Sequence, residues 1–432
     1  MIHDRRIIFV IVLTVIIFNV EKYDCFQRAE SDGKDARVFI TISSLLRHDN
    51  VTNRTIERNI ELNWIILDDE LVQNNNLWVG LYTEEPNSNS IPVAKVRING
   101  EGEGSFTTNI SYPHYILNIT KDNDYCMGYW IALVKNNNIL VKNCYYARPN
   151  WMYEMKYTIG FNSLPDLMIP GTHNAGSYLR ENRSQETRKS ALFMCQDEDI
   201  WNQLMYGIRF LDLRVTYRII KGNPEVFWIT HSYVRMNLTV REVLRTVKKF
   251  LESTNEIVII DFHLFHFFLN DEPKTYKKLM EIIENEVGQY AVPRSYGYKT
   301  TLNELWKENK RLVVGFDSLH AGESILFFPG VRHLWANSDN LSGLKRYFDN
   351  HVCSQPKNKL WSAMAELTPD WTAYVFMRFT SLRKMAQEVN LEITRWFRNG
   401  FWNCANIVST DFFLGNDIIN VAIESNKKRF DV

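Results

Sequence analysis

The chain has 432 residues, with 50 Lys and Arg against 50 Asp and Glu, and 45% of it is hydrophobic. This composition can bury a core and excludes a disordered or collagen-like chain, and the zero net charge argues against a nucleic-acid partner. Because domains usually hold about 100 to 250 residues, the length indicates two domains.

The first twenty residues have the pattern of an export signal. Arg5 and Arg6 precede an apolar stretch, residues 7–18, that is too short to span a bilayer. We predict a signal peptide over residues 1–25, with an uncleaved signal anchor as the alternative, because no clear small-residue cleavage site follows. The rest of the chain is then expected to be secreted or extracellular. Seven Asn-x-Ser/Thr sequons agree with this, at Asn50, Asn53, Asn109, Asn118, Asn182, Asn237 and Asn340.

Six cysteines in an oxidising compartment are expected to pair rather than to catalyse. Cys126 and Cys144 flank a segment whose centre, residues 135–138, reads Lys-Asn-Asn-Asn and predicts a hairpin turn. The two thiols would then face each other across adjacent strands. The second predicted pair is Cys353 with Cys404, which leaves Cys25 and Cys195.

Residues 30–148 contain short alternating apolar runs separated by polar Asn, Gly and Ser turns. This pattern, with no helical period, predicts a small antiparallel β-sandwich domain. Membrane docking, protein binding and structural support all remain open as its role. The predicted strands are residues 38–43, 60–66, 77–82, 93–98, 115–119, 129–134 and 139–145.

From residue 155 to 432 apolar strands alternate with helical stretches, at 239–251, 273–287 and 379–398. This rhythm predicts an α/β fold, a (β/α)8 TIM barrel. The barrel should be irregular, because the connection 214–225 is too short for a crossover helix. The predicted strands are residues 164–169, 208–215, 226–230, 257–262, 312–316, 333–335, 360–365 and 405–411.

Polar side chains gather where these strands end, and in such barrels the chemistry lies at the carboxyl ends of the strands. Two imidazoles with an arginine between them can act as a general acid and base around a phosphate, since His titrates near neutral pH. The guanidinium would stabilise the developing phosphorane, and a carboxylate would orient one imidazole. The candidates for these catalytic roles are His173, Arg214, His231 and Asp411.

The same residues lie in a series of motifs that resembles the X domain of phosphatidylinositol-specific phospholipase C. The motifs are Leu167-Met-Ile-Pro-Gly-Thr-His173-Asn-Ala-Gly-Ser177, Gly207-Ile-Arg-Phe-Leu-Asp212-Leu-Arg214, Ile229-Thr-His231, Glu256-Ile-Val-Ile-Ile-Asp261-Phe and Ile407-Val-Ser-Thr-Asp411-Phe. The resemblance implies that His173 is the base acting on the inositol 2-hydroxyl and that Asp411 is its partner. It also implies that Arg214 holds the phosphate and that His231 is the general acid.

The resemblance also bears on metals. Signalling enzymes of the family hold Ca2+ with acidic residues at the end of strand two, where this chain has Arg214 two residues after Asp212. We therefore predict no metal and no cofactor, as in the bacterial branch. Side chains two apart on a strand share a face, so Asp261 and His263 are predicted to meet inositol hydroxyls together with Asn174 and Asp212.

One departure from the bacterial pattern matters. Those enzymes carry Asp after the first histidine, and this chain has Asn174. Without that carboxylate His231 would be a weaker acid, so a second hypothesis stays open. In it, the chain is a catalytically weak or inactive secreted protein that binds lipid or glycan or serves adhesion. A Mg2+-dependent glycerophosphodiesterase is disfavoured, because the strand-two end lacks the Glu and Asp ligands it would need.

The predicted function is thus a secreted phosphodiesterase that cleaves an inositol phospholipid, or a glycosyl-inositol anchor, at a membrane surface. An interfacial enzyme should expose apolar residues around its mouth. Three stretches fit, residues 262–269, 325–328 and 369–376, and ordinary barrel core is the alternative for each.

Overall fold

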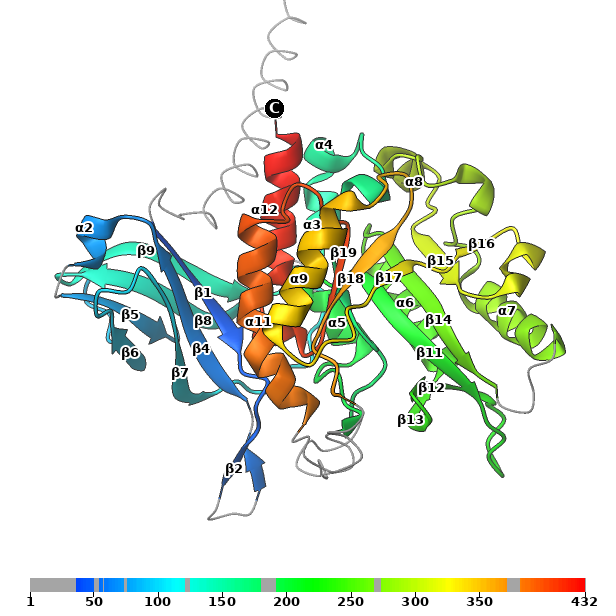
Figure 1. Ribbon diagram of the computed structural model, residues 1–432, viewed down its shortest axis with the longest axis horizontal. Coiled ribbons are helices and arrows are strands. Elements are labelled where there is room, and N and C mark those ends of the chain that lie inside the picture. Colours follow the sequence, from blue (N-terminus) through cyan, green and yellow to red (C-terminus); the bar gives the residue numbers. More distant parts are fainter. Residues whose placement is uncertain are drawn as a thin grey trace, which may run out of the picture. The chain divides into compact units, whose positions relative to one another are not determined.

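The computed structural model describes residues 36–49, 54–56, 58–73, 76–120, 125–179, 192–267, 273–370 and 381–431 (Figure 1). The predicted signal peptide and the sequons at Asn50, Asn53 and Asn182 lie outside these residues. The chain divides into two compact units. The first is Met1–Thr41, Asn59–Ser111 and Cys126–Tyr146, and the second is Ile42–Arg58, Tyr112–Tyr125 and Ala147–Val432. The predicted domain boundaries, 30–148 and 155–432, stay predictions.

The first unit contains two sheets. The larger has the order β6-β5-β8-β9 with antiparallel pairing throughout. The smaller has the order β1-β4-β7, with β4 antiparallel to β7. The face-to-face sandwich stays a prediction. The strands are β1 (Ala36–Ile42), β4 (Asn59–Ile66), β5 (Leu77–Tyr82), β6 (Ala94–Arg97), β7 (Glu103–Ser111), β8 (Cys126–Lys135) and β9 (Asn138–Tyr146). A short pair, β2 (Arg47–Asp49) and β3 (Arg54–Ile56), forms a separate ribbon.

Both predicted disulfides are present. The β8–β9 hairpin turns at Asn136 and Asn137, with φ of 52° and 63°, the left-handed geometry that a two-residue hairpin turn requires. That turn sets Cys126 and Cys144 across the hairpin with their Cα atoms 5.8 Å apart. The second bridge joins Cys353 to Cys404, with a Cα separation of 5.2 Å.

One predicted strand of this region is wrong. Residues 115–119 form no strand, because side chains of α5 (Ile200–Tyr206) satisfy their backbone instead. Trp201 Nε1 donates to the Leu117 carbonyl at 2.6 Å, and Asn202 Nδ2 donates to the Tyr115 carbonyl at 2.7 Å. Strand β7 was not predicted, since its sequence Glu-Gly-Ser-Phe-Thr-Thr-Asn-Ile-Ser carries few apolar residues.

The second unit is a mixed α/β, barrel-like fold. Eight strands pair in parallel in the order β16-β15-β14-β11-β10-β19-β18-β17. Because parallel strands point the same way, all their carboxyl ends lie at one edge. The strands are β10 (Ile169–Thr172), β11 (Phe210–Tyr217), β14 (Val258–His266), β15 (Leu312–Phe316), β16 (Phe327–Pro329), β17 (Arg332–Leu334), β18 (Trp361–Ala365) and β19 (Ile407–Thr410).

The irregularity expected near residues 214–225 takes the form of an antiparallel excursion. The predicted third barrel strand is β12 (Phe227–His231), which runs antiparallel to β11 and pairs in turn with β13 (Val234–Thr239). A short connection can only reverse the chain direction, so β12 could not be a parallel barrel strand. The eighth parallel strand is instead the three-residue β16, which was not predicted and which pairs with β15. The predicted first strand is also displaced, since residues 164–166 form the 3₁₀ helix η1 and β10 begins at Ile169.

Helices α6 (Val240–Ser253), α7 (Pro273–Val287) and α11 (Leu382–Asn399) agree with the predicted helical stretches. Thr239 begins α6 with a capping box, in which its hydroxyl and the Glu242 carboxylate satisfy each other's backbone N–H groups. Around β18 and β19, helices α9, α11 and α12 bury one cluster that includes Phe348, Phe397 and Ala422 (Figure 1). The other α-helices within the described residues of this unit are α3 (Trp151–Glu154), α4 (Lys156–Ile159), α5 (Ile200–Tyr206), α8 (Leu302–Lys307), α9 (Leu341–His351) and α12 (Ile418–Phe430).

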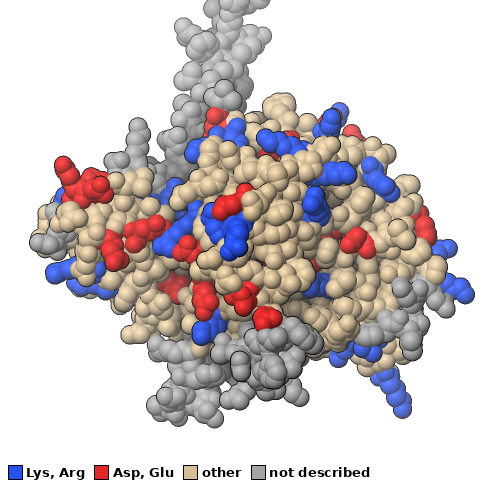
Figure 2. All heavy atoms as spheres, in the orientation of Figure 1, with Lys and Arg blue, Asp and Glu red and all other residues tan. Residues whose placement is uncertain are grey.

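Charged side chains of both signs are interspersed on the face shown in Figure 2, in keeping with the zero net charge. Within the described residues, no helix combines the length and apolar character needed to cross a bilayer.

Gly315 in β15 makes room for a buried carboxylate. A Cβ atom there would lie 2.3 Å from Asp261 Oδ1. We expect Gly315→Ala to lower the free energy of unfolding by about 1 to 3 kcal/mol, the usual cost of overpacking. Urea denaturation measures this, with Gly322→Ala as the control, because a Cβ at Gly322 approaches nothing closer than 4.0 Å. Equal stabilities of the two variants would contradict the packing argument.

Candidate active site

The central three strands of the parallel sheet bring the predicted catalytic residues together. Thr172, the last residue of β10, pairs with Leu211 of β11 on one side and with Thr410 of β19 on the other. His173 and Asp411, which directly follow β10 and β19, therefore lie beside Asp212 of β11 at the same level of adjacent strands. The short sequence distance from strand end to functional group fixes their place more firmly than a long loop could.

His173 is the centre of a hydrogen-bond chain. Its Nδ1 lies 2.8 Å from Asp411 Oδ1, and both side chains are buried. Its Nε2 lies 2.9 Å from Arg214 Nη2 and 3.0 Å from Asn174 Nδ2. Arginine and the amide NH2 can only donate, so Nε2 accepts and the proton of the neutral ring is on Nδ1. This is the tautomer of a general base.

The electrostatics strengthen that base. Burial would lower the pKa of His173, but the Asp411 carboxylate, with Glu366 nearby, outweighs burial and raises it. A carboxylate behind an imidazole acts in this way in acid–base sites.

Asp212 and Arg214 form the second half of the chain. Asp212 is fully buried, and its Oδ2 accepts from the Asn174 backbone N–H at 3.0 Å and from Arg214 Nη2 at 3.4 Å. Burial would raise the pKa of Asp212, yet Arg214 and the histidines around it hold that pKa well below its usual range. Asn174 has a φ of 44°, which turns its side chain back onto His173. Of the predicted binding residues, Asn174 thus contacts His173 directly, and Asp212 supports His173 through Asn174 and Arg214.

His231 reaches the same site from the excursion β12. Its ring centroid lies 6.4 Å from that of His173. Nδ1 lies 2.7 Å from the Phe193 carbonyl and must donate to it, so Nε2 carries the lone pair. Burial and the nearby Arg214 charge lower the pKa of His231 to about 3, and the ring is neutral at neutral pH.

Asp261 and His263 form a neighbouring cluster with His333, which was not predicted. Asp261 Oδ1 accepts from the Val331 backbone N–H at 3.0 Å, and its Oδ2 lies 3.1 Å from His333 Nε2. The rings of His263 and His333 stack with centroids 3.6 Å apart. The Asp317 carboxylate lies 3.7 Å from His263 Nδ1 and is more than half exposed.

Two groups of side chains have the composition of a metal site, and neither geometry suits one. A metal ion must lie in the plane of each imidazole that binds it, and the planes of His263 and His333 are nearly parallel and stacked. In the other group, His173 Nδ1 is already bonded to Asp411, and burial raises the pKa of the Cys195 thiol well above its usual value, which disfavours the thiolate. The prediction of no metal stays a prediction.

Sequence inspection missed three further groups of the site. Glu366 follows β18 directly, is buried, and has a pKa raised to about 7 by burial, with the Asp411 charge adding to the shift. Gln196 Nε2 donates to the carbonyls of His173 and Thr410, both at 2.9 Å, and so ties β10 to β19. Cys195 Sγ lies 3.6 Å from His231 Nδ1. Glu366 could have been found from its position after a strand, whereas residues 195 and 196 belong to no strand.

Several buried polar atoms around His173 have no hydrogen-bond partner within the protein. Native proteins rarely leave such atoms unpaired, so their concentration at one place indicates a site for a polar ligand. They are Asn174 Oδ1, Gln196 Oε1, Asp212 Oδ1, Arg214 Nε, Glu366 Oε2 and Thr410 Oγ1.

The apolar rim predicted from sequence is wrong in its key residues. Phe267 and Phe328 are 2% and 3% exposed and belong to the core, so the alternative interpretation holds for them. Phe267 packs on Tyr276, and Phe328 on Tyr298. Phe268 and residues 371–376 lie outside the described residues.

With this geometry established, the similarity to known proteins can be assessed. No family model matches the chain. The chain is 24% identical over 313 residues to "PI-PLC X domain-containing protein 1" of Danio rerio, covering 66% of this chain and 98% of that protein. It is 25% identical over 322 residues to the Homo sapiens protein of that name, covering 68% and 97%. The "Variant-surface-glycoprotein phospholipase C" of Trypanosoma cruzi is 24% identical over 304 residues, 57% of this chain and 76% of that protein.

These similarities support the resemblance of the chain to the phosphatidylinositol-specific phospholipase C X-domain family. Among solved structures, a variant of the phosphatidylinositol-specific phospholipase C of Staphylococcus aureus matches with a TM-score of 0.50 and 17% identity, covering 65% of this chain and 98% of that one. That match shows the X-domain barrel fold.

The raised pKa of His173 depends on its partner. We expect Asp411→Asn to move the His173 titration to lower pH, because burial and the Arg214 charge then act on the ring without the carboxylate that opposes them. NMR of the imidazole nitrogens measures the midpoint. Asp317→Asn, which removes an exposed carboxylate from the neighbouring cluster, should leave it unchanged. An unaltered midpoint in Asp411→Asn would show that this contact does not control the base.

Proposed function

We propose that this protein is a phosphodiesterase of the phosphatidylinositol-specific phospholipase C type. Its substrate would be an inositol phospholipid or a glycosyl-inositol anchor. The observation that supports this most directly is the chain Asp411–His173–Arg214, in which a carboxylate-backed imidazole and a guanidinium share the atom His173 Nε2. The names of the related proteins point to the same chemistry.

In the proposed reaction His173 Nε2 takes the proton of the inositol 2-hydroxyl, and the resulting oxygen attacks the phosphorus. Diacylglycerol leaves, and the inositol phosphate closes to a cyclic ester. Arg214 would bind the phosphoryl oxygens, where its fixed donors stabilise the added charge. Asp411 would stabilise the imidazolium that forms. No metal is needed in this scheme, because Arg214 supplies the positive charge.

The leaving oxygen needs a proton, and two groups can supply it. His231 is neutral in the free protein, but a phosphodiester bound at Arg214 would cancel the charge that lowers the pKa of His231 and so favour its protonated form. Glu366 is the second candidate, because its pKa of about 7 leaves it partly protonated at neutral pH. The two differ in their effect on the acid–base profile of the reaction.

The main test is hydrolysis of phosphatidylinositol in EDTA. We expect turnover without divalent ions and a fall in kcat of about 100- to 10,000-fold in His173→Ala, the usual contribution of a general base. Arg214→Met should lose about 100- to 1,000-fold, as when a donor to a developing oxyanion is removed. Lys221→Met, an exposed cation of the β11–β12 connection, is the matched control and should keep full activity.

Two results would contradict the proposal. Turnover that survives His173→Ala would exclude this mechanism. Binding of inositol lipid with no turnover by the parent protein would favour instead the receptor or adhesion hypothesis that Asn174 suggests.

The proton donor is identified by pH profiles of kcat. If Glu366 supplies the proton, Glu366→Gln should remove the decline of activity above neutral pH, because a neutral amide no longer titrates, and should lower the rate by about 100-fold. If His231 supplies it, His231→Ala should produce these effects and Glu366→Gln should retain the decline. Profiles unchanged in both variants would mean that neither group donates.

Interfacial binding would use a different set of residues from that predicted by sequence. Tyr233, beside His231, and Leu319, after β15, are 73% and 102% exposed, and both follow strands at the edge that carries the site. Exposed apolar side chains of this kind insert into the headgroup region.

We expect Tyr233→Ser combined with Leu319→Ser to weaken binding to phosphatidylinositol vesicles by about tenfold while leaving hydrolysis of a soluble inositol phosphodiester unchanged. Vesicle sedimentation measures the binding. Phe161→Ser is the control, since Phe161 is 80% exposed but follows α4, away from the site edge. Equal losses in the control and the double variant would refute a docking surface at this edge.

The proposal includes export of the protein to an extracellular location. The four sequon asparagines that the structure describes, Asn109, Asn118, Asn237 and Asn340, are all exposed, as glycosylation requires. Two disulfides suit an oxidising compartment.

A further inference from the structure

A pocket of about 330 Å³ lies at the opposite edge of the parallel sheet from His173. Its wall contains Trp361, the first residue of β18, together with Asp166, which precedes β10, and Cys404, which precedes β19. These three strands are parallel, so the residues that begin them lie at the edge remote from the catalytic groups. The volume is within the range of small-molecule sites, about 300 to 1,000 Å³. The proposed reaction uses none of these residues.

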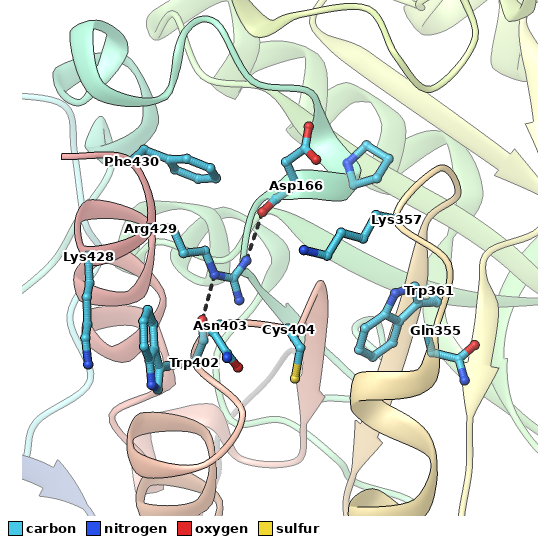
Figure 3. Close-up of a pocket in the computed structure, with 11 residues that line it drawn as sticks. Asp166, Gln355, Lys357, Trp361, Trp402, Asn403, Cys404, Lys428, Arg429 and Phe430 are labelled. Carbon is cyan, nitrogen blue, oxygen red and sulfur yellow. Dashed lines mark hydrogen bonds between the residues drawn. The ribbon is translucent and has the colours of Figure 1, made fainter. Parts of the chain in front are cut away.

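Positive charge dominates the pocket. Lys357 and Arg429 point toward each other across it, and Lys428 stands at its margin (Figure 3). The one lining carboxylate, Asp166, is turned to Ser163, whose backbone N–H and hydroxyl it accepts at 3.0 and 2.5 Å. Two converging cations repel each other unless an anion lies between them.

Arg429 is held in place by the backbone. Nε, Nη1 and Nη2 donate to the carbonyls of Trp402, Asp166 and Ala405 at 2.6, 2.9 and 2.8 Å. Burial lowers the pKa of Arg429 to about 10, so it stays charged at neutral pH. These three bonds leave two of its five N–H groups for a ligand. A fixed, partly buried guanidinium of this kind is suited to oxyanions.

A second observation, independent of charge, concerns Gln355. Its Nε2 donates to the His351 carbonyl at 2.9 Å, which identifies the other amide atom as oxygen. That oxygen, Oε1, is buried and has no hydrogen-bond partner in the protein, and Figure 3 shows the amide turned away from Lys357 and Arg429, so a ligand reaches it only if the side chain turns toward the pocket. It can only accept, so it suits a ligand that carries hydroxyl groups.

The aromatic residues of the wall suit the same ligand. The indole rings of Trp361 and Trp402 line the pocket, and the Lys428 ammonium lies 3.7 Å from the Trp402 ring centroid (Figure 3). Flat apolar faces beside hydroxyl acceptors are suited to sugar rings. The Cys353–Cys404 bridge joins the loop of Gln355 and Lys357 to the segment of Trp402, which reduces the cost of ordering the pocket when a ligand binds.

We propose that this pocket is a second ligand site, which binds a sugar bearing a phosphate or sulfate group. The oxyanion lies between Lys357 and Arg429, and a ring hydroxyl donates to Gln355 Oε1 once that side chain turns toward the pocket. The free sugar phosphate and the sulfated sugar of a glycan share this chemistry, and the two can be separated by titration.

The test is isothermal titration calorimetry of the purified protein with glucose 6-phosphate, glucose 6-sulfate, glucose and inorganic phosphate. We expect saturable binding of at least one sugar ester, with weaker binding of inorganic phosphate and of neutral glucose. The ester with the higher affinity indicates whether the natural ligand is a free sugar phosphate or the sulfated sugar of a glycan. Lys357→Ala should weaken the affinity for that ester by about tenfold, the loss of one charge-assisted hydrogen bond. Lys359→Ala, an exposed lysine of the same loop outside the pocket, should leave it unchanged.

The active site could also hold a phosphate, so the titration is repeated in Arg214→Met. Binding that persists there supports a separate pocket, and binding that disappears assigns the ligand to the active site and overturns the proposal. Lys357→Ala should retain full hydrolysis of phosphatidylinositol. The proposal of a second ligand site and the proposed phosphodiesterase activity can therefore fail independently of each other. Absence of saturable binding by both esters, or equal affinity in Lys357→Ala, would also overturn it. If inorganic phosphate binds as tightly as the esters, the sugar ring adds no affinity, and the assignment of a sugar ligand is refuted.

Discussion

The site depends on one electrostatic constraint, the burial of two carboxylates at the edge of an apolar barrel. Asp411 and Asp212 are 4% and 0% exposed, and an isolated carboxylate in such a place would lose its charge. His173 bonds to the first, and Arg214 bonds both to the second and to His173. The acidic and basic groups alternate along one chain, so removing His173 or Arg214 leaves a buried carboxylate without that partner.

A second buried network holds the segment beneath that chain. Asp197 accepts from Arg58 at 3.3 Å and from Arg383 at 3.0 and 2.6 Å, and Glu198 accepts from Arg58 at 2.9 Å. This fixed segment carries Cys195 and Gln196. The Cys195 side chain contacts His231, and the Gln196 side chain bridges the ends of β10 and β19. Residues far from the chemistry thereby support the segment beside the two imidazoles, whose ring centroids lie 6.4 Å apart.

The sequence predicted those parts of the structure that local patterns determine. Periodicity located helices α6, α7 and α11, and the turn at residues 135–138 predicted the first disulfide. Position at or near the carboxyl end of a predicted strand identified His173, Asp212, Asp261 and Asp411. Patterns failed where side chains distant in sequence satisfy the backbone, as at residues 115–119, and where an apolar run such as residues 262–267 suits core and membrane alike. Cys195, Gln196 and His333 were missed because contacts between distant segments bring them to the site.

In the proposed mechanism the same constraint couples binding to catalysis. In the free protein Arg214 and Asn174 both donate to His173 Nε2, the atom that must take the proton. An incoming phosphate is a stronger acceptor for a guanidinium than a neutral imidazole is, so it would draw Arg214 away and leave only the neutral Asn174 amide on the lone pair. The same anion would favour protonation of His231. One ionic contact would thus activate both imidazoles, and Asn174, unlike an aspartate, adds no negative charge that would hold Arg214 back.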